Sequence, residues 1–136
     1  MGLVVPDTVE IVTLNSILGP ALTLKLYSNN KIPAGGDTAA AYTEVSGGGY
    51  ANKPLTFANW VITSGTPSAA QYNALQQWTF TGPTDAPGTI YGYFVIRNSD
   101  GLLQWAERFP AGSLPFSPIA GSIIRVLPKF TVGSQF

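Results

Sequence analysis

Hydrophobic and polar positions alternate most clearly in residues 21–27, where Leu22, Leu24 and Leu26 are separated by polar residues. A two-residue period is typical of a half-buried β-strand, so we expect the three leucines to point inward and Tyr27 outward. Further short runs predict strands at residues 53–57, 59–64, 75–81 and 123–132. In the last run Pro128 lacks a backbone donor, which indicates a sheet edge or a bulge there.

Residues 90–109 carry the strongest local signal, because two aromatic-rich runs flank the turn sequence Asn98-Ser-Asp-Gly101. This pattern predicts a β-hairpin in which Gly101 closes the turn, and pairing Arg97 with Leu102 fixes its register. One face is expected to be core and consists of Ile90, Phe94, Ile96, Leu103, Trp105 and Phe109, with Gly92 and Glu107 between them. The other is expected to be a wet contact surface and consists of Tyr91, Tyr93, Val95, Arg97, Gln104 and Arg108. Glu107 would lie opposite Gly92, either neutralised by an arginine or reaching water at the strand end.

Residues 8–19 predict a short helix that Asp7 or Thr8 would cap and that Gly19-Pro20 ends. Ile11, Leu14 and Leu18 would share one face, although the β-branched content is also compatible with a strand. One further helical turn is expected within residues 38–45. The glycine run at residues 47–49 is either a flexible tip or a backbone that must approach another segment closely.

Polar, Gly- and Pro-rich stretches predict connections at residues 28–37, 66–70, 82–88 and 110–122. Several short strands separated by such turns indicate a mainly β fold, an antiparallel sandwich or jelly-roll-like domain with a short N-terminal helix. The predicted organisation is an N-terminal segment at residues 1–19 and a single β-rich domain at residues 20–136.

Charge is sparse along the whole chain, at 10% of residues against about 25% in ordinary soluble domains. Seven acidic and seven basic residues give a formal net charge of zero, and 45% of residues are hydrophobic. Such a surface gains little solubility from self-repulsion, which favours a protein whose surface is covered by other subunits. Without a basic patch, a signal sequence or a long apolar run, we expect synthesis in the cytoplasm and neither nucleic acid nor membrane as partner.

The chain contains no His and no Cys, which removes histidine bases, thiolates, disulfides and the usual transition-metal ligand sets. Asp37 and Glu44 form the one close acidic pair outside the N-terminal segment, and a small glycan-active enzyme would need such a pair. A loop cap and a solvated turn account for these acids more simply. We therefore expect no catalytic residues, no cofactor and no metal. Tryptophans Trp60, Trp78 and Trp105 are expected in the core.

Several segments together resemble a group of small virion proteins of tailed bacteriophages, over about residues 22–130. The resemblance rests on Leu22-Thr-Leu-Lys-Leu-Tyr-Ser-Asn-Asn30, Tyr42-Thr-Glu-Val-Ser-Gly-Gly-Gly-Tyr-Ala51, Trp78-Thr-Phe-Thr-Gly82, Ile90-Tyr-Gly-Tyr-Phe-Val95 and Leu103-Gln-Trp-Ala-Glu-Arg-Phe109. It implies a head decoration (cement) protein that binds the outside of the major capsid protein shell, commonly as a homotrimer, and locks capsomers together. The implied location is the capsid exterior of the virion, and no catalytic residues transfer from the resemblance.

The contact residues that we predict lie in two places. They are Tyr91, Tyr93, Gln104 and Arg108 on the hairpin, and Gly48 and Tyr50 in the glycine-rich loop. A tail, baseplate or fibre protein that touches a host glycan through Trp60 or Tyr50 is the main structural alternative.

Overall fold

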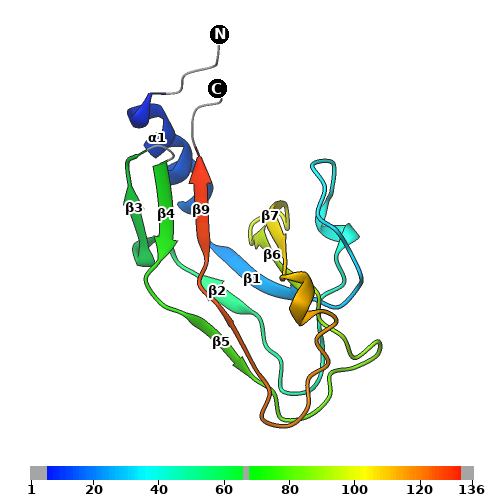
Figure 1. The fold of residues 1–136 in the computed structure, drawn as a ribbon. Coiled ribbons are helices and arrows are strands. Elements are labelled where there is room, and N and C mark those ends of the chain that lie inside the picture. Colours follow the sequence, from blue (N-terminus) through cyan, green and yellow to red (C-terminus); the bar gives the residue numbers. More distant parts are fainter. Residues whose placement is uncertain (1–5, 66–67, 133–136) are drawn as a thin grey trace.

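The computed structural model describes residues 6–65 and 68–132, and this part of the chain is mainly β, with one α-helix and three antiparallel sheets (Figure 1). The predicted fold class, mainly β and antiparallel with an N-terminal helix, is confirmed. Residues 1–5 of the predicted N-terminal segment, residues 66–67 of a predicted connection and residues 133–136 of the predicted domain lie outside the described residues.

The largest sheet has four strands in the order β2 (Lys53–Leu55), β1 (Leu22–Tyr27), β6 (Gly92–Arg97) and β7 (Leu103–Arg108). In β1 the three leucines are fully buried, as the alternation predicts. The outward position predicted for Tyr27 is wrong, because this side chain is also 0% exposed. Tyr42, in the segment between β1 and β2, packs on Tyr27 and Phe94, so that β1 is buried on both faces near its end.

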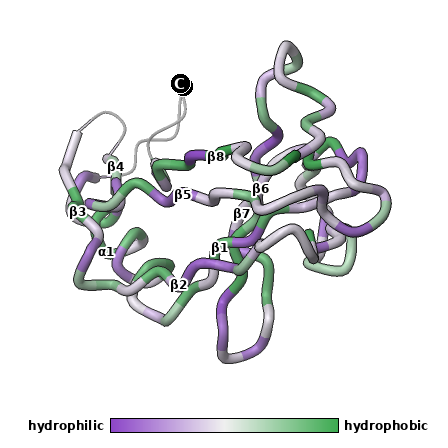
Figure 2. Tube along the Cα trace, turned by 90° about the horizontal axis from the view of Figure 1, so that it is seen from below, coloured by the Kyte–Doolittle hydropathy of each residue, from purple (hydrophilic) through white to green (hydrophobic). Residues whose placement is uncertain are grey.

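Two smaller antiparallel sheets form most of the rest of the fold. One has the order β3 (Trp60–Thr63), β4 (Ser68–Tyr72) and β9 (Lys129–Val132), and the other pairs β5 (Gln76–Thr79) with β8 (Ile123–Val126). Figure 2 shows β5 and β8 side by side. The strand predicted at residues 123–132 therefore divides between two sheets. The division falls at Pro128, and both resulting strands are edge strands, as the missing donor predicts.

Strand β4 falls where the sequence predicts a connection at residues 66–70, so that prediction is wrong. Its sequence, Ser-Ala-Ala-Gln-Tyr, has few of the β-branched and aromatic residues that mark strands. Pairing on both sides supplies what local propensity lacks, since β4 lies between β3 and β9. The predicted helical turn is present as a 3-10 turn at Ala39–Ala41, and two more occur at Phe57–Asn59 and Ala111–Ser113.

The predicted helix is present as α1 (Asp7–Leu18), and its buried face carries Leu14 and Leu18, as predicted. Its start lacks the predicted cap, because Pro6 occupies the N-cap position and no side chain bonds the first turn. Leu14 and Leu18 are fully buried, in the same core cluster as residues of β3, β4 and β9. The helix therefore shares one hydrophobic core with the sheets.

Two hydrophobic clusters lie on opposite faces of the β1–β6 pair. The main cluster joins α1 to all three sheets and includes each of the predicted core tryptophans, of which Trp60 and Trp78 are buried and Trp105 is partly buried. The second is smaller and consists of Tyr27, Tyr42 and Phe94, with Ala41, Tyr91, Ile96, Leu103 and Ala106 packed against it. The second cluster includes residues of the hairpin on which the sequence predicts a contact surface.

Candidate interaction surface at the β6–β7 hairpin

The β6–β7 hairpin forms as predicted, and the Arg97 N–H donates to the Leu102 oxygen at 2.9 Å. The next pair, Ile96 with Leu103, also follows the predicted register, and beyond it the register differs by one residue. Val95 pairs with Trp105 and Ile96 with Leu103, so Gln104 has no opposite residue and forms a β-bulge. Gly101 has a φ of 71°, as its position in the turn requires.

The bulge changes the side of the sheet on which the later residues lie. Tyr93 is 5% exposed and Val95 0%, and both belong to the main cluster together with Trp105. Phe94 instead joins the second cluster, on the opposite face. The prediction of one core face and one wet face is therefore wrong, because a single extra residue inverts the facing of a strand and both faces are covered.

Tyr91 and Arg108 do meet, as the sequence predicts. The Arg108 guanidinium lies over the Tyr91 ring at 5.1 Å from its centroid, and both side chains are half-buried. Arg108 Nη1 also donates to the Lys31 backbone oxygen at 3.0 Å, and the Tyr27 hydroxyl donates to the same oxygen at 3.0 Å. These contacts fix the start of the β1–β2 segment against the hairpin. Arg108 therefore acts as an internal anchor.

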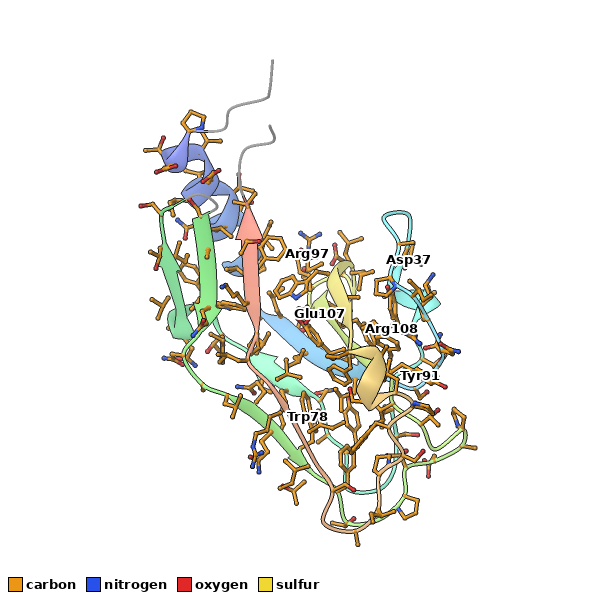
Figure 3. The ribbon with its side chains drawn as sticks, in the orientation of Figure 1. Asp37, Trp78, Tyr91, Arg97, Glu107 and Arg108 are labelled. Atoms are coloured by element: carbon orange, nitrogen blue, oxygen red, sulfur yellow. The ribbon has the colours of Figure 1, made fainter. Side chains whose placement is uncertain are left out.

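Residues 31–42 form a loop that is held by its own contacts; Figure 3 shows Asp37 on it, beside the hairpin that carries Glu107 and Arg108. Asp37 pairs with the Lys31 ammonium at 2.8 Å and accepts hydrogen bonds from the Ala34 N–H and the Tyr42 hydroxyl, each at 2.8 Å. The hydrogen bond from Lys31, followed by that from Ala34, lowers the pKa of the Asp37 carboxyl. Burial raises the pKa of Tyr42, and Asp37 raises it further.

A groove of about 370 Å³ lies between this loop and β7. Its loop side consists of Pro33, Ala34, Gly35, Asp37 and Tyr42, and its strand side of Leu103, Gln104, Trp105 and Ala106. Gln104, a predicted contact residue, therefore lines the groove, and its amide Nε2 donates to the Leu102 oxygen at 3.0 Å. The groove carries no free charge on its loop side, since Asp37 is already paired with Lys31.

Gly48 and Tyr50 lie at a second place, against Trp78 and residues 81–83. Tyr50 stacks on Trp78 at 6.4 Å between ring centroids, and its hydroxyl donates to Glu44 at 2.8 Å. Burial raises the pKa of Tyr50. Gly48 has a φ of 62°, and a Cβ there would lie 2.7 Å from the Gly82 oxygen. At the glycine run the backbone therefore passes close to another segment, residues 81–83, and the run is not a flexible tip.

Three other candidate groups are placed as follows. Glu107 pairs with Tyr93 and its side chain is exposed, so its carboxylate reaches water. Gly92 makes room for Tyr27, because a Cβ on Gly92 would lie 2.7 Å from the Tyr27 ring. Asp37 and Glu44, the acids considered for glycan chemistry, each pair with a separate lysine, Lys31 at 2.8 Å and Lys25 at 3.2 Å.

The residues that sequence reasoning missed are those of the loop side, above all Lys31 and Tyr42. Tyr42 stacks on Phe94 at 5.3 Å and meets Tyr27 edge-on at 5.0 Å, which holds the loop beside β7. Tyr42 follows three alanines in a segment for which the sequence predicts a helical turn. The tyrosine itself is the one available signal, because an aromatic side chain outside a strand needs a surface on which to pack.

Comparison with protein-family models, curated proteins and solved structures finds no match. Over residues 6–65 and 68–132, no helix has the length and hydropathy to cross a membrane. The same residues contain no group of three or more acidic, His or Cys side chains arranged to hold a metal ion.

Proposed function

We propose that the protein is a structural component of a tailed-phage virion, a decoration protein that binds the outer face of the capsid shell and bridges capsomers as a homotrimer. Two independent lines support the proposal. One is the resemblance of its segments between Leu22 and Phe109 to small phage virion proteins. The other is the physical character of its surface, which carries few charges, half of them paired or buried within the chain.

The pairing of these charges is the observation that carries the proposal. Seven acidic and seven basic residues make fourteen charged side chains, and three ion pairs in the described residues occupy six of them. Glu10 is a further charged residue that is withdrawn from the surface, at 2% exposure. The seven charged side chains that remain are few for a chain of 136 residues, and the formal net charge is zero, so self-repulsion opposes association only weakly. A bridging protein uses many modest contacts repeated over a lattice.

The two alternatives find less support in the same residues. A fibre protein that touches a glycan would need an exposed aromatic ring, but Trp60 is 7% exposed and the Tyr50 hydroxyl already bonds Glu44. A glycan-active enzyme would need two carboxylates that face one substrate, whereas Asp37 and Glu44 have separate lysine partners. A non-enzymatic role in assembly accounts better for both arrangements.

The copy number in purified virions of the phage that encodes this chain tests the proposal. Quantitative mass spectrometry should find the protein in hundreds of copies, comparable with the major capsid protein. A handful of copies would instead indicate a tail or baseplate component and would contradict decoration.

A binding assay tests the bridging role separately. Heads purified from phage that lack the gene should bind the added protein to saturation and should then resist mechanical or thermal rupture better than bare heads. Sedimentation should show the isolated protein as a trimer. Heads that bind nothing would contradict the assignment of the partner.

A further inference from the structure

The outer edge of β7 offers backbone groups that no other strand uses. β7 is the last strand in the order β2-β1-β6-β7, so only β6 pairs with it among the described residues. The groove of about 370 Å³ touches four successive residues, Leu103, Gln104, Trp105 and Ala106. Because successive side chains of a strand point to opposite faces, a groove that touches all four runs along the backbone edge.

The hydrogen-bond pattern identifies which backbone groups face the groove. The Asn98 N–H bonds Ala21 on the β1 side, whereas the Arg97 N–H bonds Leu102 on the β7 side. Because backbone groups alternate in direction along a strand, the N–H and C=O groups of Val95 and Tyr93 also face β7, where these residues pair with Trp105 and Glu107. Leu103 pairs with Ile96 and Ala106 with Phe94, and the backbone groups of these two β6 residues face β1. The N–H and C=O groups of Leu103 and Ala106 therefore point away from β6, to the open edge. The bulge at Gln104 explains why residues three apart point the same way.

The geometry of the loop selects the kind of occupant. Pro33, Ala34, Gly35 and Asp37 line one side of the groove and β7 lines the other; the ribbon of this loop runs beside the β6–β7 hairpin in Figure 1. A second folded copy would have to bring its own β6 and its own loop to the part of β7 that these loop residues already flank. A single extended segment of polypeptide needs only the spacing of one strand, about 4.8 Å from β7. The lining also carries no unpaired charge, which favours an uncharged segment.

We propose that this groove binds an extended, uncharged segment of a partner polypeptide, which adds to the sheet as a fifth strand beside β7. Backbone hydrogen bonds to Leu103 and Ala106 provide the affinity, and side chains that contact Leu103 and Tyr42 provide the specificity. The inference goes beyond the proposed function, because it does not depend on a virion or on which protein supplies the segment.

Peptide selection with the isolated full-length protein tests this inference. A yeast-displayed library of random dodecapeptides is selected on the protein, and the enriched peptides are synthesised and added to it. Amide hydrogen exchange, followed by NMR, should show the Leu103 and Ala106 amides exchanging fast in the free protein and slowly with peptide. The Trp105 amide, which already faces β6, should not change.

Two variants provide matched controls. Ala106→Pro removes the outward N–H, and proline is tolerated on the open side of an edge strand. It should bind the selected peptides about tenfold more weakly or not at all. Ala106→Thr keeps the N–H and should bind them within about twofold of wild type. Circular dichroism confirms that both variants fold; if Ala106→Pro does not, the exchange data on the wild type decide alone.

Three results would overturn the inference. One is selection of no peptide that slows exchange at Leu103 and Ala106. Another is unchanged binding by folded Ala106→Pro. The third is protection of these amides without peptide that grows with protein concentration, because this would identify a second copy as the occupant. Each result leaves the copy number in virions, and so the proposed function, to be decided separately.

Discussion

At the scale of single residues, the most unusual contact is a hydrogen bond between two buried polar side chains. The Ser68 hydroxyl donates to the Glu10 carboxylate at 2.6 Å, and the two residues are 0% and 2% exposed. Glu10 lies one helical turn before Leu14, on the buried face of α1. A buried carboxylate requires a donor, so this one bond allows an acidic residue to occupy a core position.

Removal of that donor should destabilise the fold. Ser68→Ala leaves the Glu10 carboxylate buried without its hydroxyl partner, and we expect the free energy of unfolding to fall by about 1–3 kcal/mol. Urea unfolding measures the change. Ser117→Ala, at an exposed serine, is the control and should stay within about 0.5 kcal/mol of wild type. Equal stabilities for the two variants would show that the bond contributes nothing.

Gly92, like Gly48, is a position at which the packing leaves no room for a side chain. A Cβ there would meet the Glu107 backbone oxygen and would lie 2.7 Å from the Tyr27 ring and hydroxyl. We expect Gly92→Ala to lower the free energy of unfolding by about 1–3 kcal/mol, because the packed ring must move. Thermal unfolding should show the loss. Gly112→Ala, where nothing lies within 4 Å, should be neutral or slightly stabilising; a similar loss there would contradict the steric cause.

At the scale of elements, the turn of the β6–β7 hairpin is closed by an ion pair. The hydrogen bond from Arg97, followed by the Leu102 backbone N–H, lowers the pKa of Asp100 from the usual 3.8 to about 2. Because the pKa in the folded state is the lower one, the stabilisation is complete above about pH 4 and is lost as the pH falls toward 2.

An NMR titration of the Asp100 carboxyl tests this arrangement. In the wild type it should titrate at a pKa of about 2, and in Arg97→Gln the value should rise toward 3.8. Arg125→Gln removes an exposed arginine that bonds Gln77 instead, so it should leave the titration of Asp100 unchanged. An ordinary pKa for Asp100 in the wild type would show that the turn does not hold the pair in solution.

The same hairpin shows how far sequence patterns reach. Its two strands, its turn and the Arg97–Leu102 pair follow from local chemistry, because Asn98 to Gly101 allows few conformations other than a turn. The bulge at Gln104 leaves no such signal. Leu-Gln-Trp-Ala fits either facing, and tertiary packing selects the one that buries Trp105 beside Trp60, 6.1 Å away between centroids. The bulge separates Trp105 from Phe94, and burial of β6 on both faces hides the side on which Tyr93 lies.

Two other parts of the fold also depend on tertiary contacts that the local sequence does not show. β4 is a strand because it pairs with β3 and β9, whereas the sequence Ser-Ala-Ala-Gln-Tyr by itself does not predict a strand. β8 and β9 form one continuous hydrophobic pattern, and only Pro128 indicates where the chain passes from one sheet to the next. The candidate groove depends on a contact between distant segments, β7 and residues 33–42, which no local pattern encodes.

At the scale of the whole molecule, the β1–β6 pair is covered on both faces. The main cluster lies on one face and the Tyr27, Tyr42 and Phe94 cluster on the other. This arrangement explains why β1 ends in a buried tyrosine, and why β6 contains four buried residues in succession at Gly92, Tyr93, Phe94 and Val95. A strand that is covered on both faces is hydrophobic at successive positions and lacks the two-residue alternation. Its sequence therefore does not show which side chains point to which face of the sheet.

The shared core also leads us to expect that helix and sheets unfold together. Leu14 of α1 is 0% exposed in the main cluster, so Leu14→Ala should lower the free energy of unfolding of the whole described fold by about 2–5 kcal/mol. Tryptophan fluorescence reports on Trp60, Trp78 and Trp105 in the sheets, and far-ultraviolet circular dichroism reports on secondary structure throughout. Their urea transitions should coincide in wild type and shift together in the variant.

Val12→Ala provides the matched control on the same helix, because Val12 is 66% exposed and its loss should change stability by no more than about 0.5 kcal/mol. If Leu14→Ala shifted only the circular dichroism transition and left tryptophan fluorescence unchanged, α1 would be an independent arm that rests on the sheets. Coincident shifts would instead make the helix part of the single cooperative unit. In that case any surface that α1 presents to an assembly partner is held as rigidly as the sheets themselves.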